Sequence, residues 1–360
     1  MDVGLLMFPS PGTPASGWSS IPLPKPLALL RAARARGSAS FGQLAEVLGF
    51  HSVVMADTQC LTPEVWSQLM LVASATRRIE IGTGVTNSVS RDPAVTASSA
   101  LGLQVASEGR AVLGIGRGDS SMAKIGKRPA PPTDFERYLE QLRAYLAGEE
   151  ILRDGSPSRI EWLDDIEVPK VPIEVAATGP KVIEIAARRA DRICFAVGAD
   201  TERLGECIAH ARRAAEAADR DPDALRFGAY LNCVINPDRD VAREAIRGGL
   251  SVFAHFSGFR GMDIESLPEG TRAAARHLRT DYDMTHHGKA AGDHAQALDA
   301  EFIHRFGIAG PLDEAVARFR DIKACGIEFA RVVPGSRDMP PALASTSIRS
   351  LAKVARQVAQ

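Results

Sequence analysis

Ala-Val-Leu-Gly-Ile-Gly-Arg-Gly-Asp-Ser, residues 111–120, is the stretch that decides the fold of this chain. An apolar run without alternation is typical of a strand buried on both faces. It passes directly into alternating glycines, which leave the backbone open to close approach by another group. We interpret the segment as a buried parallel strand that ends at a ligand site. Gly116, Gly118 and Asp119 are candidate binding residues at that end.

Two other apolar runs end in the same way, at residues 82–87 (Gly-Thr-Gly-Val-Thr-Asn) and 176–180 (Ala-Ala-Thr-Gly-Pro). In the first, the Gly84–Val85 pair predicts a β-bulge or a strained peptide. In the second, a threonine hydroxyl and free backbone N–H groups meet at a helix start, which suits a phosphate. The alternative is that the glycines only satisfy turns. The candidate cofactor-binding residues here are Gly84, Val85, Thr86, Asn87, Ala177, Thr178 and Gly179.

Strand-like and helix-like segments alternate along the chain, which predicts a (β/α)8 TIM barrel in the α/β class. Thr62-Pro63-Glu64 is expected to open one of the helices, with Thr62 as its N-cap. We expect one domain over 1–360, with a proline-rich loop at 9–26 and an insertion at 255–310 over the barrel mouth. The expected strands are 3–8, 52–56, 79–85, 111–116, 172–176, 192–197, 226–235 and 327–333.

Composition narrows the class of protein. The chain has 360 residues, of which 45% are apolar and 24% charged, as in an ordinary globular enzyme. A net charge of -1 argues against a nucleic-acid or membrane partner. No apolar run is long enough to span a bilayer, and no basic leader precedes the first strand, so a cytoplasmic location is expected. Five dispersed cysteines predict reduced thiols, with no disulfide framework and no metal site.

The ordered motifs resemble the luciferase-like superfamily of flavin-dependent oxidoreductases. The resemblance rests on residues 84–87, 91–98, 109–119 and 178–181, together with Ala187 to Asp191 and, more loosely, 306–333. Within that superfamily, the chain is most similar to the methylenetetrahydromethanopterin reductases. The resemblance implies a TIM barrel that binds FMN or the deazaflavin F420 at its C-terminal mouth, and that usually pairs as a homodimer.

The resemblance also assigns roles to individual residues. It implies a non-proline cis peptide at Gly84–Val85, behind the cofactor ring, and a phosphate-binding turn at Thr178 and Gly179. Asp57 matches the aspartate that lies near the ring. The chain departs from the reductases at Leu6, where they carry an acidic residue, and at Thr58-Gln59, where a histidine usually follows the aspartate. We therefore expect a different, more apolar substrate than the pterin.

Proton transfer then needs another source, and the insertion contains the adjacent His286 and His287. With Asp57, they are the candidate catalytic residues; the alternative is that the histidines form a solvated turn. The leading hypothesis is an oxidoreductase that moves two electrons between F420 or FMN and a small organic substrate. One alternative is a monooxygenase that uses reduced FMN, O2 and a partner flavin reductase. A second is a non-catalytic, cofactor-binding barrel whose mouth lacks titratable groups.

Overall fold

The structure is a computed structural model that describes residues 1–7, 37–164, 166–259 and 262–359. The proline-rich loop expected at 9–26 lies outside these residues. Among the helices that the structure describes, the first is α1 (Gly37–Leu48).

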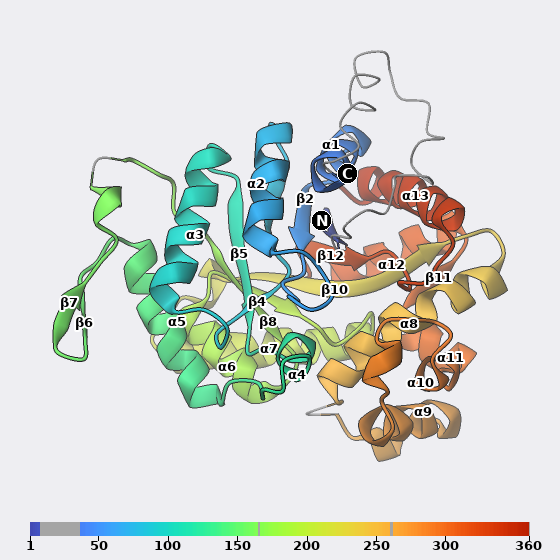
Figure 1. Ribbon diagram of the computed structural model, residues 1–360. Coiled ribbons are helices and arrows are strands. Elements are labelled where there is room, and N and C mark those ends of the chain that lie inside the picture. Colours follow the sequence, from blue (N-terminus) through green and yellow to red (C-terminus); the bar gives the residue numbers. More distant parts are fainter. Residues whose placement is uncertain (8–36, 165, 260–261, 360) are drawn as a thin grey trace, which may run out of the picture.

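Eight parallel strands close into a barrel, which confirms the predicted (β/α)8 fold (Figure 1). In chain order they are β1 (Asp2–Met7), β2 (Ser52–Met55), β3 (Glu80–Thr83), β5 (Ala111–Gly116), β8 (Ile173–Ala177), β9 (Arg192–Phe195), β10 (Arg226–Ile235) and β12 (Phe329–Val333). Each pairs with its neighbours in the ring, and the β9–β10 and β1–β12 pairings close it. A further short strand, β11 (Ile308–Gly310), extends β10 outside the ring.

Helices cover the outside of the barrel and bury their apolar faces against the strands (Figure 1). After α1 these are α2 (Val65–Ala75), α3 (Pro93–Ala106), α5 (Pro132–Leu146), α6 (Pro180–Arg189), α7 (Thr201–Glu216), α8 (Arg239–Ser257), α12 (Leu312–Ala324) and α13 (Pro341–Ala359). None of the helices in the described ranges is both long and apolar enough to cross a bilayer.

The start of α2 differs from the prediction. The helix begins at Val65, and the Glu64 side chain caps it by accepting a hydrogen bond from the Ser67 N–H at 2.8 Å. Thr62 is not the N-cap, because its hydroxyl donates to the carbonyl oxygens of Ala56 and Thr58 in the preceding turn. The start of α3 does follow the prediction, since Asp92 caps it and Pro93 is its first residue.

A charged layer fills the barrel at the N-terminal end of the strands. Arg331 is 1% exposed and forms a double contact with Glu174, with Nε–Oε1 at 3.0 Å and Nη2–Oε2 at 2.5 Å. Glu80 accepts from Arg331 at 3.1 Å and pairs with Arg192 at 2.8 Å. These residues come from four different strands, so the network ties the ring together at the end opposite the predicted site.

The segment between β10 and β12 forms a helical subassembly on the side of the barrel where α4 (Ser120–Ala123) lies (Figure 1). It contains α9 (Glu269–Thr280), α10 (Asp293–Gln296) and α11 (Ala300–Phe306). The helices share an apolar core with α8, and Phe259, Phe302 and Phe306 form its aromatic centre.

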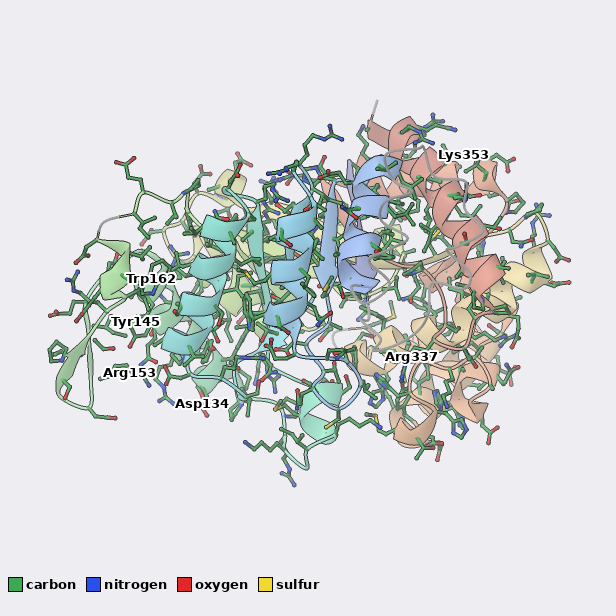
Figure 2. All side chains as sticks on the ribbon, turned by 45° about the horizontal axis from the view of Figure 1, so that its top comes forward. Asp134, Tyr145, Arg153, Trp162, Arg337 and Lys353 are labelled. Atoms are coloured by element: carbon green, nitrogen blue, oxygen red, sulfur yellow. The ribbon has the colours of Figure 1, made fainter. Side chains whose placement is uncertain are left out.

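A hairpin that the sequence did not predict projects from the barrel beside α3 and α5 (Figure 1). Its strands are β6 (Ile151–Arg153) and β7 (Ser156–Ser158). Arg153, labelled in Figure 2, pairs with Asp92 at 2.6 Å and so joins the hairpin to the start of α3.

Candidate functional site

The three glycine-rich strand ends lie side by side at the C-terminal mouth of the barrel. Thr86 and Asn87 form β4, a continuation of β3 whose register places Asn87 opposite Gly116 of β5. Strand β8 pairs with the other side of β5, so Thr178 follows the next strand in the ring. The predicted cofactor-binding residues therefore occupy one sector of the mouth.

The Gly84–Val85 peptide bond is cis, as the resemblance implies. The glycines around it serve two different purposes. A Cβ on Gly114 would lie 2.1 Å from the Thr83 carbonyl oxygen, so this glycine is required for β3 and β5 to pack together. A Cβ on Gly116 would meet only Val85 Cγ2, at 3.3 Å, among the described atoms. Gly116 is therefore the glycine that leaves the strand end open.

Polar groups suited to a cofactor gather beside this opening. Asn87 Oδ1 accepts from the Val89 and Ser90 N–H groups, which fixes its amide, while its buried Nδ2 has no partner among the described residues. No side chain of the described chain caps α6, whose N-cap is Gly179. An uncapped helix start offers N–H groups to a phosphate, and Thr178 precedes it. These residues fit a flavin-type cofactor, with the polar tail on α6.

Asp57 lies at the end of β2 and is 3% exposed. Its Oδ2 accepts from the Thr86 hydroxyl at 2.7 Å and forms an ion pair with Arg91 Nη1. Arg91 also pairs with Glu64, the cap of α2, at 2.9 Å. This network fixes the residue that follows the cis peptide, so Asp57 holds Thr86 in place at the mouth. A direct catalytic role for Asp57 stays a prediction.

The two adjacent histidines lie in different surroundings. His286 is half exposed, and its Nδ1 lies 2.6 Å from Asp283 Oδ2. His287 is 5% exposed, and its Nδ1 lies 2.8 Å from the Tyr282 hydroxyl. Burial lowers the pKa of His287 to about 4, helped by the positive charges of Arg337 and Lys124. His287 is therefore a neutral imidazole at pH 7.

The neighbours of His287 pack against the apolar interior of the barrel. The His287 ring lies 6.0 Å from that of Phe256, and both Phe256 and Tyr282 pack against one apolar cluster of strand and α8 residues. Val85, the residue after the cis bond, packs against the same cluster. Phe256 and Tyr282 therefore form an aromatic wall beside His287.

Two hydrogen bonds join the insertion to loops that follow barrel strands. Lys124, just after α4, donates to the Met284 carbonyl oxygen of the insertion at 3.0 Å. From the loop after β12, Arg337 donates to the His287 carbonyl oxygen at 3.1 Å. Asp119 lies close enough for its charge to raise the pKa of Tyr282, although burial is the larger cause. The loops after β5 and β12 therefore both contact the insertion.

The buried histidine makes the stability of the fold depend on pH. Because the folded-state pKa of His287 lies below its ordinary value of 6.5, the unfolded chain binds the proton more readily. Stability is therefore lost as pH falls from about 6.5 toward 4. For this group we expect a loss of about 2 kcal/mol between pH 7 and pH 5. Burial also lowers the pKa of His294, which acts in the same direction. Denaturant unfolding at both pH values measures the loss, and His287→Gln should lose visibly less; an equal loss would contradict this origin.

Sequence reasoning missed Arg91, Tyr282, Phe256 and Lys124 as members of the site. Arg91 belongs to a quoted motif, but its ion pair with Asp57 spans 34 positions. Tyr282 lies close to the two histidines in the sequence of the insertion, yet nothing in that sequence indicates its contacts with α8. Among the described residues, no group of histidine, cysteine and acidic side chains could hold a metal.

Comparison with known proteins agrees with this geometry. The model of the luciferase-like monooxygenase family matches residues 18–328. The chain belongs to this family. Among similar relatives of this luciferase-like protein is 5,10-methylenetetrahydromethanopterin reductase of Methanolobus tindarius, 28% identical over 305 residues, covering 83% of the chain and 89% of the relative.

Solved structures of low identity share the luciferase-like fold. An F420-dependent secondary alcohol dehydrogenase, solved with an F420–acetone adduct, aligns with a TM-score of 0.72 at 18% identity, covering 99% of this chain and 98% of that one. A monooxygenase from Streptomyces bottropensis aligns with a TM-score of 0.67 at 22% identity, covering all of both chains. F420-dependent dehydrogenases and monooxygenases therefore both occur on this fold.

Proposed function

We propose that the protein is an oxidoreductase that binds F420 or FMN at the barrel mouth and transfers two electrons to or from a small, apolar organic substrate. The observation that carries this is the convergence of Asn87, Gly116 and Thr178 on one sector of the mouth. Family membership supplies the reaction class, and the name of the methanopterin reductase relative supports F420-type chemistry. The bound cofactor carries the electrons, and the chain orients it and excludes water.

In this proposal each part of the mouth has one task. The α6 start and Thr178 hold the cofactor's polar tail, and Asn87 Nδ2 donates to an acceptor on it. Val85 supports the ring from behind, while Phe256 and Tyr282 supply the apolar wall for the substrate. His287 contacts the oxygen of the substrate, because it is a buried polar side chain beside that wall.

The cofactor assignment predicts the effect of one substitution. Thr178→Val keeps the shape of the side chain but removes its hydroxyl. We expect cofactor affinity to fall about tenfold, roughly the value of one hydrogen bond to a charged group. Fluorescence titration measures the affinity, and Thr346→Val on the exposed face of α13 is the matched control. Unchanged affinity in Thr178→Val would remove this residue from the site.

A monooxygenase that uses reduced FMN, O2 and a partner reductase is the second candidate. The name of the family favours it. Under this alternative the purified protein consumes O2 only when reduced FMN is supplied. Under the F420 alternative it reduces or oxidises its substrate without O2. We further propose a cytoplasmic location, in keeping with five cysteines that are all free thiols.

The helices α2 and α3 support the further proposal of a homodimer. They pack side by side (Figure 1), and neither contains a charged residue. Met70, Val95 and Val105 on them are 44%, 53% and 40% exposed. An uncharged face with exposed apolar residues is typical of a protein interface. We expect light scattering to give twice the chain mass, and Val95→Asp to shift it toward the monomer. A monomeric wild type would contradict the proposal.

A further inference from the structure

Tyr282 lies at the centre of a cluster of histidine rings. Its hydroxyl lies 2.8 Å from His287 Nδ1, and its ring stacks on His255 with centroids 4.0 Å apart and an interplanar angle of 15°. The ring of His294 lies 4.2 Å away, tilted by 41°. His255 is itself fixed by a 3.1 Å hydrogen bond between its Nδ1 and the Leu278 carbonyl oxygen. The Tyr282 ring therefore has little freedom to move.

The hydrogen bonds around the Tyr282 hydroxyl determine where its proton goes. The Gly288 N–H and the Ser251 hydroxyl are the other polar groups beside this oxygen. The hydroxyl of Ser251 donates to the Gly248 carbonyl oxygen at 2.9 Å, so its own proton is already used. A phenol is a stronger donor than a neutral imidazole N–H, and an imidazole nitrogen is a stronger acceptor than a hydroxyl. The Tyr282 proton therefore points at His287 Nδ1.

We propose that Tyr282 is a positioning residue that holds His287 as its Nε2–H tautomer, so that a neutral N–H group meets the oxygen of the substrate. The tautomer of a histidine is set by the hydrogen bond that its other ring nitrogen makes. The proposal rests on the proposed function, since it concerns the same site. It also narrows the substrate class, because a neutral N–H donor suits a carbonyl oxygen rather than a cation.

The surroundings of His287 agree with a neutral donor. Burial lowers its pKa. The charges of four neighbouring groups lower it further, namely Arg337, Lys124, His255 and His294. A neutral imidazole that donates to a carbonyl oxygen polarises the carbonyl carbon toward attack, without adding a net charge to the site. Phe256 and Tyr282 supply the apolar surroundings in which such a hydrogen bond is strong.

The test reads the tautomer directly. In protein labelled with ¹⁵N-histidine and free of cofactor, long-range ¹H–¹⁵N correlation spectra distinguish a protonated ring nitrogen from an unprotonated one. We expect wild-type His287 to carry its proton on Nε2, and Tyr282→Phe, which keeps the ring stack, to give a mixture of both tautomers. Tyr145→Phe is the matched control, because it removes a 2.7 Å hydroxyl hydrogen bond to Ser158 beside the hairpin, far from Arg337 and the insertion (Figure 2).

The steady-state kinetics of the same variants provide a second test. Tyr282→Phe should lower kcat by up to about tenfold, with little change in KM, as expected for one lost neutral hydrogen bond. Combined with His287→Gln it should cause no further loss, because Tyr282 acts through His287. A wild-type Nδ1–H tautomer, or an unchanged tautomer in Tyr282→Phe, would overturn the inference. Full activity in His287→Gln would instead overturn the proposed role of His287, and the spectra would still decide the tautomer.

Discussion

His287→Gln is expected to lower turnover by about 10²–10⁴-fold, the usual range for a positioned proton-handling group. His287 is buried beside the apolar wall of the mouth and bonded to Tyr282. His286→Gln should stay within about twofold of wild type, because its half-exposed side chain is paired with Asp283, whereas the buried His287 is bonded to Tyr282. Steady-state rates with the true substrate compare the two variants, and cofactor affinity should be unchanged in both.

The contrast between these neighbours is the informative part of the experiment. If both single variants keep full activity, neither histidine handles the proton of the substrate, and the cluster only shapes the lid over the mouth. If His286→Gln is the slower variant, the assignment of the site to the buried side of the segment is wrong.

Arg331→Met is expected to destabilise the barrel by about 3–5 kcal/mol, because it leaves a buried carboxylate without its cation. Glu174 is 1% exposed and has Arg331 as its ion-pair partner in the described chain. Thermal unfolding should shift down by on the order of 10 °C. Arg226→Met is the matched control at the same end of the barrel: its partners Asp2 and Glu328 are exposed, and we expect a cost below about 1 kcal/mol.

A second variant separates the lost charge from the lost packing. Converting both Glu174 and Arg331 to methionine removes the unpaired carboxylate and should recover much of the stability. If Arg331→Met unfolds at the same temperature as the wild type, the charged layer does not hold the ring together. Melting of the double variant at or below that of the single variant would show that packing, rather than charge, causes the loss.

Much of the fold could be predicted from the sequence, because a strand buried on both faces leaves a continuous apolar run. The strand Ala111–Gly116 shows this directly: all six of its residues are buried. Helix starts were less certain, since Thr62 and Glu64 can both cap and only the tertiary contacts select between them. The hairpin Ile151–Ser158 has no strong hydrophobic periodicity, and its strand residues are exposed or half-buried. The sequence therefore did not indicate it.

The candidate site was predictable in part for a similar reason. Residues at strand ends, such as Asn87 and Thr178, are brought together by the topology of any such barrel. The partners of His287 are not, because Phe256 reaches it from α8 and Arg337 reaches it from the loop after β12. The sequence also could not rank His286 against His287, since their difference lies in burial alone.

Titration of the purified protein with F420 and with FMN, followed by cofactor fluorescence, tests the central claim most directly. The account predicts saturable binding of one of the two at one site per chain, weakened about tenfold by Thr178→Val and unaffected by Thr346→Val. If neither cofactor binds saturably, or if Thr178→Val leaves the affinity unchanged, the result would contradict a flavin-type site at the mouth of this barrel.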